Sequence, residues 1–264
     1  MILLPGIIAS GKRKAADPLF DAIMARAPTG YWRLDETSGT TAFDSSGNGN
    51  HGAYVGPQPS TPGLILAAEV LLPGSPYSAK KYPDFSGSHD SSINGTVRIS
   101  DVPLHQITSG TIMCFTKMLT GNGLNNPGGC AFLFGKQNSF AMYNNVNGFY
   151  GHNSLGFLAI YDEIGSGFKT SAAQIGPIGG IAPPRHIALK FAMGVTNGST
   201  LYLDGVPVFV FTYQGASGAS FGLSIADSQF QDACQPSNGQ NGECAIFNTL
   251  LADADIAAIN AAGR

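Results

Sequence analysis

The stretch YWRLDETSGTTAFDSSGNGNHGAYVG, residues 31–56, is the most informative part of the chain. It begins with a short aromatic segment, bends at two acidic residues, passes through a loop rich in Gly and Asn, and returns as a second short segment. Short segments of this kind, separated by Gly, Asn, Asp and Ser, are typical of β-strands joined by tight turns. The stretch therefore predicts two strands around a polar loop.

The same pattern continues along the rest of the chain. LYLDGVPV at 201–208 places Asp204-Gly205 between two apolar segments, which is the strongest hairpin signal in the sequence. With 264 residues, 35 Gly and 16 Pro, the chain suits an all-β, two-sheet antiparallel jelly-roll sandwich over residues 30–264. The expected strands lie near 31–35, 51–55, 64–72, 95–100, 111–119, 130–135, 139–143, 155–161, 186–193, 200–204, 207–213, 221–226 and 243–247.

A short helix is expected over residues 16–27. Asp17 is a good N-cap, Pro18 suits the first helical position, and Pro28 ends the helix. Two alternatives stay open for its apolar face: it packs on its own domain, or it belongs to an N-terminal anchor, residues 1–29, that docks on a neighbouring subunit. The residues of this face are Leu19, Phe20, Ile23 and Met24.

A third segment, AIFNTLLADADIAAINAAG at 245–263, closes the chain and predicts a short C-terminal helix over 252–262. In this order, the three segments resemble the laminin-G-like (concanavalin A-like) jelly-roll domains. Residues 31–36 match the aromatic pair and acidic bend of that family, residues 44–50 match its Asp-Ser-Ser-Gly-Asn-Gly-Asn loop, and residues 202–205 match its Tyr-x-Asp-Gly hairpin. The last strand departs from the usual Ile-Asp-Glu-Val. The resemblance implies a fold that usually binds and only sometimes catalyses.

Residues 1–29 lie outside that resemblance. A start of the type MILLPGI, then a short helix and such a domain, resembles structural proteins of tailed bacteriophages. This implies a non-enzymatic virion protein, assembled in the host cytoplasm as a homo-oligomer or in many copies, and held to other virion proteins by residues 1–29. The displayed domain would decorate the particle or adhere to host-surface glycans by avidity. The alternative is a free carbohydrate-binding or adhesive bacterial protein without a virion role.

Charge and hydropathy exclude several partners. Charged residues make up 12% of the chain and the formal net charge is −3, so no general attraction to nucleic acid is expected. The apolar run at the start is followed, not preceded, by basic residues, which is the wrong order for a secretory signal. No apolar run reaches the roughly 20 residues that span a bilayer.

The loop at 44–50 is the best candidate for a metal site. Asp44 offers a carboxylate, and Asn48 and Asn50 add side-chain oxygens, which are the ligands that calcium prefers. Family members often bind calcium here, so the resemblance implies Ca²⁺ as a cofactor. The alternative is a plain turn, in which Asp and Asn cap backbone amides and the glycines take positive φ.

Two further loops, 120–129 and 144–153, are rich in Asn and Gly. Amide donors beside exposed rings suit glycan recognition, and the same composition suits a loop pressed against another subunit. The candidate contacts are Asn125, Asn126, Phe149, Tyr150 and His152. Trp32, the only Trp, is expected in the core.

Catalytic residues have little support, and no enzyme is predicted. Glycoside hydrolysis needs two carboxyl groups roughly 5–9.5 Å apart. Asp35-Glu36 and Asp162-Glu163 are adjacent pairs, whose side chains in a strand point to opposite faces. His186 precedes an apolar strand and is expected to be a hydrogen-bonded structural residue.

The four cysteines show no spacing typical of zinc. Cys114 lies in an apolar strand and is expected in the core. Cys234 and Cys244 flank a polar loop, so they either close a disulfide or stay reduced.

Overall fold

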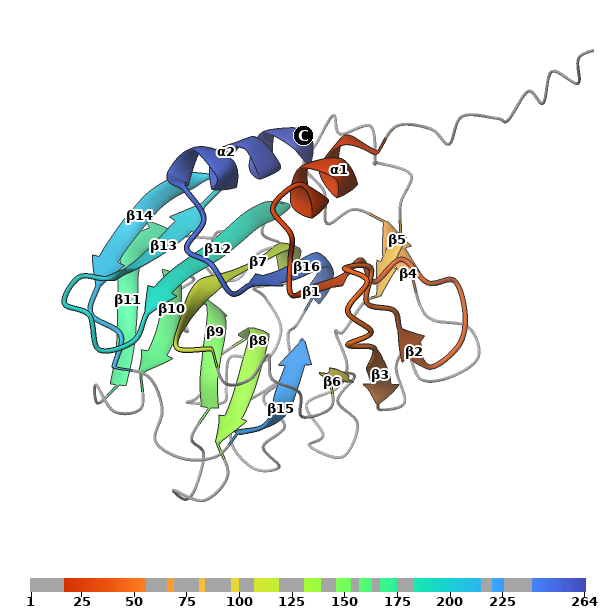
Figure 1. Ribbon diagram of the computed structural model, residues 1–264, viewed down its shortest axis with the longest axis horizontal. Helices are drawn as coiled ribbons and strands as arrows, with labels where there is room; N and C mark the ends of the chain where they lie inside the picture. The colour runs from red at the N-terminus through yellow and green to blue at the C-terminus, as the bar shows by residue number, and fades with distance from the viewer. Residues whose placement is uncertain are drawn as a thin grey trace, which may run out of the picture.

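Two antiparallel β-sheets stack face to face, and two short helices lie on the outside of one of them (Figure 1). The computed structural model describes residues 17–55, 66–68, 81–83, 96–99, 107–118, 131–138, 146–152, 157–162, 167–174, 183–214, 220–225 and 239–264. The architecture confirms the predicted all-β, two-sheet sandwich with one short helix near each end. Neither helix is long and apolar enough to cross a membrane within this described part of the chain.

The six-stranded sheet carries the helices on its outer face (Figure 1). Its strands, in spatial order, are β1 (Gly30–Trp32), β16 (Gly239–Phe247), β7 (Ser109–Met118), β12 (Arg185–Ala192), β13 (Ser199–Leu203) and β14 (Val206–Phe211). The hairpin between β13 and β14 turns at Asp204 and Gly205, with φ of 53° and 79°. Two successive positive φ angles are typical of the type I′ turn that Asp-Gly favours, so the predicted hairpin is confirmed.

The eight-stranded sheet forms the other layer. Its spatial order is β11 (Gly167–Gln174), β10 (Phe157–Asp162), β9 (Val146–His152), β8 (Ala131–Asn138), β15 (Ser220–Ile225), β6 (Thr96–Ile99), β3 (Gly52–Val55) and β2 (Thr41–Ala42). A small two-stranded sheet of β4 (Leu66–Ala68) and β5 (Lys81–Pro83) lies beside the sandwich.

Five of these strands differ from the sequence expectation, and two of them, β2 and β5, are short segments for which no strand was expected. Residues 146–152 and 167–174 are strands, β9 and β11, although the first was expected in a loop and the second had no assignment. Strand β16 begins at Gly239 and not near 243. Strand β9 and the first half of β16 are rich in Gly and Asn, and none of β9, β11 and β16 shows apolar alternation, so their pairing partners determine the strand conformation. The expected strand at 139–143 lies outside the described residues.

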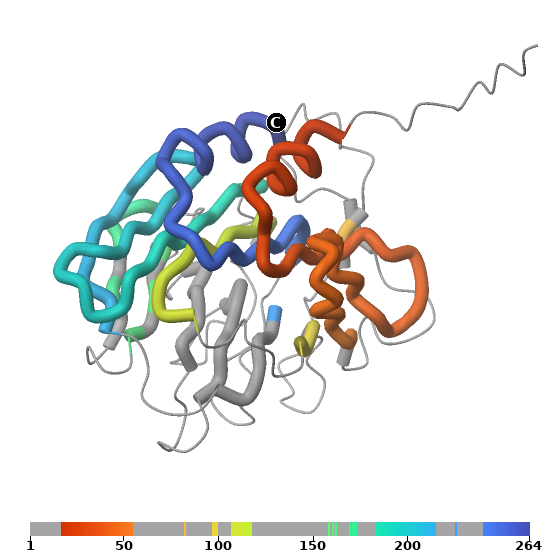
Figure 2. The backbone as a smooth tube through the Cα atoms, viewed as in Figure 1, coloured from red at the N-terminus to blue at the C-terminus, as the bar shows by residue number. Residues whose placement is uncertain are grey.

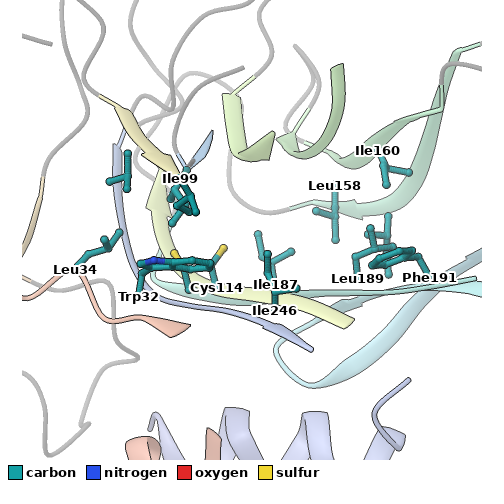
Figure 3. Packing of buried hydrophobic residues seen from close by; sticks show 14 of the residues in the cluster. Trp32, Leu34, Ile99, Cys114, Leu158, Ile160, Ile187, Leu189, Phe191 and Ile246 are labelled. Atoms are coloured by element: carbon teal, nitrogen blue, oxygen red, sulfur yellow. The ribbon is translucent and has the colours of Figure 1, made fainter. Parts of the chain in front are cut away.

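A first hydrophobic core fills the space between the two sheets (Figure 3). Trp32, Cys114 and Ile187 reach it from the six-stranded sheet, and Ile99 and Leu158 from the eight-stranded sheet. Burying each such side chain stabilises the fold by roughly 1.5–3 kcal/mol. The core position expected for Trp32 and Cys114 is confirmed, since both are fully buried.

A second core lies between the six-stranded sheet and the helices α1 (Pro18–Met24) and α2 (Asp253–Ala262). The two helices come from opposite ends of the chain and lie side by side (Figure 2). Arg26, just after α1, joins them through an ion pair of 2.8 Å with Asp255. Residues far apart in sequence therefore close the same face of the sheet.

Helix α1 packs on its own domain. Asp17 caps it as predicted, accepting a 3.1 Å hydrogen bond from the amide of Phe20. Leu19 and Ile23 are fully buried in the second core, and Phe20 and Met24 pack against it in part. The first of the two alternatives for this apolar face is therefore the one observed, and Leu19 and Ile23 are not available to a neighbouring subunit.

Candidate functional site

The outer face of β2, β3 and β6, at one end of the eight-stranded sheet, is the best candidate site. Side chains alternate between the faces of a strand. The inward positions are buried: Ala42, Gly52, Tyr54, Val97 and Ile99. The alternate positions point away from the core: Thr41, Phe43, His51, Ala53 and Arg98. Register places Thr41 opposite Ala53, and Ala53 opposite Arg98.

An exposed aromatic ring dominates this face. Phe43 directly follows the edge strand β2, and 55% of its surface is exposed. Its ring meets the imidazole of His51 edge to face, with ring centres 5.4 Å apart and planes at 75°. The pair presents apolar ring surface to solvent beside a polar group.

Hydrogen bonds hold the backbone on both sides of this ring. The amide of Phe43 donates to Oε1 of Glu36 at 2.8 Å, and the amide of Asp44 donates to Nδ1 of His51 at 3.0 Å. The hydroxyl of Tyr54 donates to Oε2 of the same Glu36 at 2.7 Å. Because Nδ1 accepts, a neutral His51 carries its proton on Nε2, which leaves one N–H donor on an exposed side chain.

Arg98 adds a cation to the same face. It lies on β6, two strands from β2, so at the usual strand spacing the backbones of β2 and β6 are about 10 Å apart. Arg98 is exposed, and the residue opposite it on β3 is the small Ala53. Among the residues described, no ion pair involves Arg98.

In the loop at 44–50, the carboxylate of Asp44 accepts hydrogen bonds from backbone amides. Oδ1 of Asp44 accepts from the amides of Tyr31 and Ser46, and Oδ2 accepts from the amide of Asn50, each at 2.9 Å. A carboxylate has about four acceptor positions, and three are taken by N–H donors. A calcium ion takes 6–8 oxygen ligands, and N–H groups aimed at the carboxylate compete with it. The residues at Asp44 do not fit this cation.

The other two predicted calcium ligands also bind backbone. The side-chain nitrogens of Asn48 and Asn50 donate to the carbonyl of Thr29 at 3.1 and 2.9 Å. Gly47 and Gly49 take φ of 88° and 76°, which a turn needs and other residues rarely adopt. Within the described ranges, no group of three or more His, Cys, Asp or Glu can hold a metal. Calcium stays a prediction from the resemblance, without support from this geometry.

The predicted glycan contacts are not brought together in a loop. Phe149, Tyr150 and His152 lie within β9, an internal strand of the eight-stranded sheet between β8 and β10. The expectation of a loop at 144–153 is therefore wrong for 146–152, because pairing with both neighbouring strands holds this segment extended. Asn125 and Asn126 lie outside the described residues.

A buried polar cluster was missed by sequence reasoning. Glu243 is fully buried at a bulge in β16, with φ of 51°. It accepts hydrogen bonds from the hydroxyls of Tyr31 and Tyr82, and Arg33 lies 3.6 Å away. Arg33 also pairs with Asp17 at 2.6 Å. The departure of the last strand from Ile-Asp-Glu-Val was the available signal.

This Glu243 cluster is structural. Burial raises the pKa of Glu243, and Arg33 and the two tyrosine hydroxyls oppose that rise by favouring the carboxylate. The cluster links the start of α1 to β1, β5 and β16. The ring of Tyr82 lies so close to Gly242 that an added Cβ would stand 2.1 Å from its Cδ1. Every charged group in the cluster already has a partner in the chain.

His186 is not the hydrogen-bonded residue that we expected. It is fully buried and stacks on Phe115 with ring centres 4.6 Å apart, and neither ring nitrogen has a hydrogen-bond partner in the structure as described. Burial lowers its pKa to about 3. It is therefore a neutral core ring at physiological pH.

Cys244 lies beside Cys114 in the first core, and both thiols are free and buried. Burial raises the pKa of the Cys244 thiol. Of the two alternatives for Cys234 and Cys244, the free thiol is observed at Cys244, and Cys234 lies outside the described residues.

No family model and no curated protein sequence matches this chain. Among solved structures, it is similar to Trypanosoma rangeli sialidase in complex with 2,3-difluorosialic acid. The match covers 98% of this chain and 36% of that chain, at 15% identity and a TM-score of 0.53. The same sialidase in complex with sialic acid is similar over 89% of this chain and 32% of that chain, at 12% identity and a TM-score of 0.51. The CBM40 of the Ruminococcus gnavus IT-sialidase is similar over 60% of this chain and 85% of that chain, at 14% identity and a TM-score of 0.45.

The chain thus spans about a third of the sialidase chains that it matches. At these identities, the likeness shows the fold alone. Fold and comparison together define the class of protein: an antiparallel jelly-roll β-sandwich.

Proposed function

We propose that this chain is a non-enzymatic, glycan-binding β-sandwich. The observation that carries the proposal is the exposed ring of Phe43 beside the imidazole of His51 on the outer face of the sheet. Binding sites for small molecules combine apolar or aromatic surface with a few placed polar groups. The C–H face of a sugar can lie on the ring of Phe43 while a hydroxyl oxygen accepts from Nε2 of His51.

Preorganisation supports the same function. Ordering a mobile side chain or loop at a binding site costs roughly 0.5–1.5 kcal/mol per side chain. The amides of Phe43 and Asp44 are already bonded to Glu36 and His51. A sugar therefore meets a face whose backbone is ordered before it binds.

The comparisons are consistent with a glycan as the ligand class. The sialidase that shares the fold was solved in complex with sialic acid. A β-sandwich of this fold thus occurs in a protein solved with a bound sugar. For this chain, glycan binding is a proposal that a binding experiment can test.

A glycan array with three proteins tests the proposed function. Wild type should bind a subset of the glycans, and Phe43→Ala should weaken that binding by at least about tenfold, or about 1.4 kcal/mol. Val210→Ala is the matched control, because Val210 is equally exposed, at 55%, and lies on β14 of the other sheet. Absence of any glycan binding by the wild type would contradict the proposal.

We further propose that the domain is displayed on the particle of a tailed phage, in many copies of weak affinity. Support comes from the resemblance of the N-terminal arrangement to phage structural proteins and from the low content of charged residues, 12%. Since Leu19 and Ile23 belong to the second core, we assign attachment to residues 1–16, which precede the helix.

Two deletions test this assignment. Removal of residues 1–16 should leave a folded protein that no longer incorporates into particles, whereas removal of residues 1–29 should also disrupt the second core. A chain that never co-purifies with particles would favour the alternative, a free carbohydrate-binding or adhesive bacterial protein.

A further inference from the structure

Among the described residues that point outward from β2, β3 and β6, Arg98 is the one with a permanent charge, and stacking of a sugar on Phe43 would not use it. It is exposed on β6, opposite Ala53, on the same side of the sheet as Phe43 and His51. A guanidinium is planar, always charged and presents paired N–H donors that match a carboxylate.

We infer that the face formed by Phe43, His51 and Arg98 binds a saccharide that carries a carboxylate. The carboxylate lies against the guanidinium of Arg98, the sugar ring lies toward Phe43, and Nε2–H of His51 donates to a hydroxyl or ring oxygen. The separation of about 10 Å between the outer strands suits a sugar unit of one or two rings. This inference rests on the proposed glycan binding and specifies its ligand class.

The two carboxylates next to Phe43, those of Glu36 and Asp44, bind groups of their own part of the chain. Both oxygens of Glu36 accept hydrogen bonds, one from the amide of Phe43 and one from the hydroxyl of Tyr54. Asp44 is buried, and three backbone amides surround its carboxylate. Among the described residues neither carboxylate forms an ion pair with Arg98, so its guanidinium can pair with an anionic group of a ligand.

A paired ligand panel tests the inference. Each carboxylated oligosaccharide of the panel is compared with its own carboxyl-reduced, neutral form, so that shape is kept and charge is removed. Binding to wild type, Arg98→Gln and Arg264→Gln is measured by isothermal titration calorimetry. Arg264 is exposed at the C-terminal end of the chain, so its replacement removes the same charge away from this face.

Wild type should prefer the carboxylated member of a pair by at least about tenfold, which corresponds to about 1.4 kcal/mol. Arg98→Gln should abolish the preference and Arg264→Gln should keep it. The preference should also weaken as the salt concentration rises, because exposed charges are screened.

The outcomes separate this inference from the proposed function. Equal binding of both members by wild type, still sensitive to Phe43→Ala, overturns the inference and leaves glycan binding in place. A preference that survives in Arg98→Gln places carboxylate recognition elsewhere and also overturns it. Wild type that binds no member of any pair overturns the inference, and the proposed function falls with it when the glycan array is negative as well.

Discussion

The Glu243 cluster and the Phe43 face use the same kinds of side chain in opposite ways. Both combine aromatic rings, a carboxylate and an arginine. In the cluster, Glu243 is fully buried and Arg33 pairs with three carboxylates, so the charges hold elements together. On the face, Phe43 and Arg98 are exposed to solvent, so both side chains can contact a ligand. Exposure, more than residue type, therefore separates a structural group from a binding group.

Replacement of Glu243 should have the largest effect on stability. Glu243→Ala leaves the hydroxyls of Tyr31 and Tyr82 without their acceptor and removes one partner of Arg33. Breaking a buried ion pair costs about 3 kcal/mol, measurable by denaturant unfolding. Asp35→Ala is the matched control, since Asp35 contacts the same Arg33 at 3.5 Å but is partly exposed; its loss should cost less than about 1 kcal/mol. Similar losses in both variants would contradict the comparison.

Asp44→Ala should have the next largest effect. Three backbone amides lose their common acceptor, and hydrogen bonds to a charged group are worth about 1.5–3 kcal/mol, so a loss of about 2 kcal/mol is expected. Because the amides occupy the carboxylate, addition of calcium to the wild type should leave its melting temperature unchanged. A rise in melting temperature with calcium that Asp44→Ala abolishes would restore the metal site.

His186 should contribute to the loss of folding stability at acidic pH. Burial lowers its pKa to about 3, whereas an unfolded chain protonates histidine near 6.5. Its contribution to stability is therefore present above about pH 6.5 and is lost as the pH falls toward 3, by at most about 1.4 kcal/mol per pH unit. His186→Phe should flatten the profile of unfolding free energy in this window. An unchanged profile would show that His186 is accessible to protons in the folded state.

Phe43→Ala should have the smallest effect on stability and the largest on binding. Exposed substitutions change the free energy of unfolding by about 0.5 kcal/mol or less, and the ring of Phe43 is mostly in solvent. The unfolding curve should match that of the wild type while glycan binding falls. A loss of stability like that of Glu243→Ala would make Phe43 a structural residue and erase the contrast between the two regions.

The parts of the fold that follow local rules were predictable from the sequence. Asp204-Gly205 specifies a tight hairpin because both residues tolerate positive φ, and Asp17-Pro18 specifies a helix start. Strand β9 was not predictable, because its Asn and Gly residues favour turns and only pairing with β8 and β10 makes it a strand.

The candidate site depends on register, which the sequence does not show. Phe43 and His51 flank the predicted 44–50 loop, and Arg98 lies more than 40 residues further along the chain. Only the pairing of β3 with β2 and with β6 puts the three side chains on one face. Asp44, by contrast, was identified from its motif, but its neighbouring amides determine that it closes a turn.

The most direct test of the proposed glycan-binding face is a map of where a sugar binds. Amide and side-chain chemical shifts of the labelled protein are followed by NMR while the tightest-binding oligosaccharide of the array is added. We expect the perturbed signals to gather at Phe43, His51, Ala53 and Arg98, with those of α1 and α2 unchanged. Perturbations that gather elsewhere, or none at a saturating sugar concentration, would contradict the assignment of this face as the binding site.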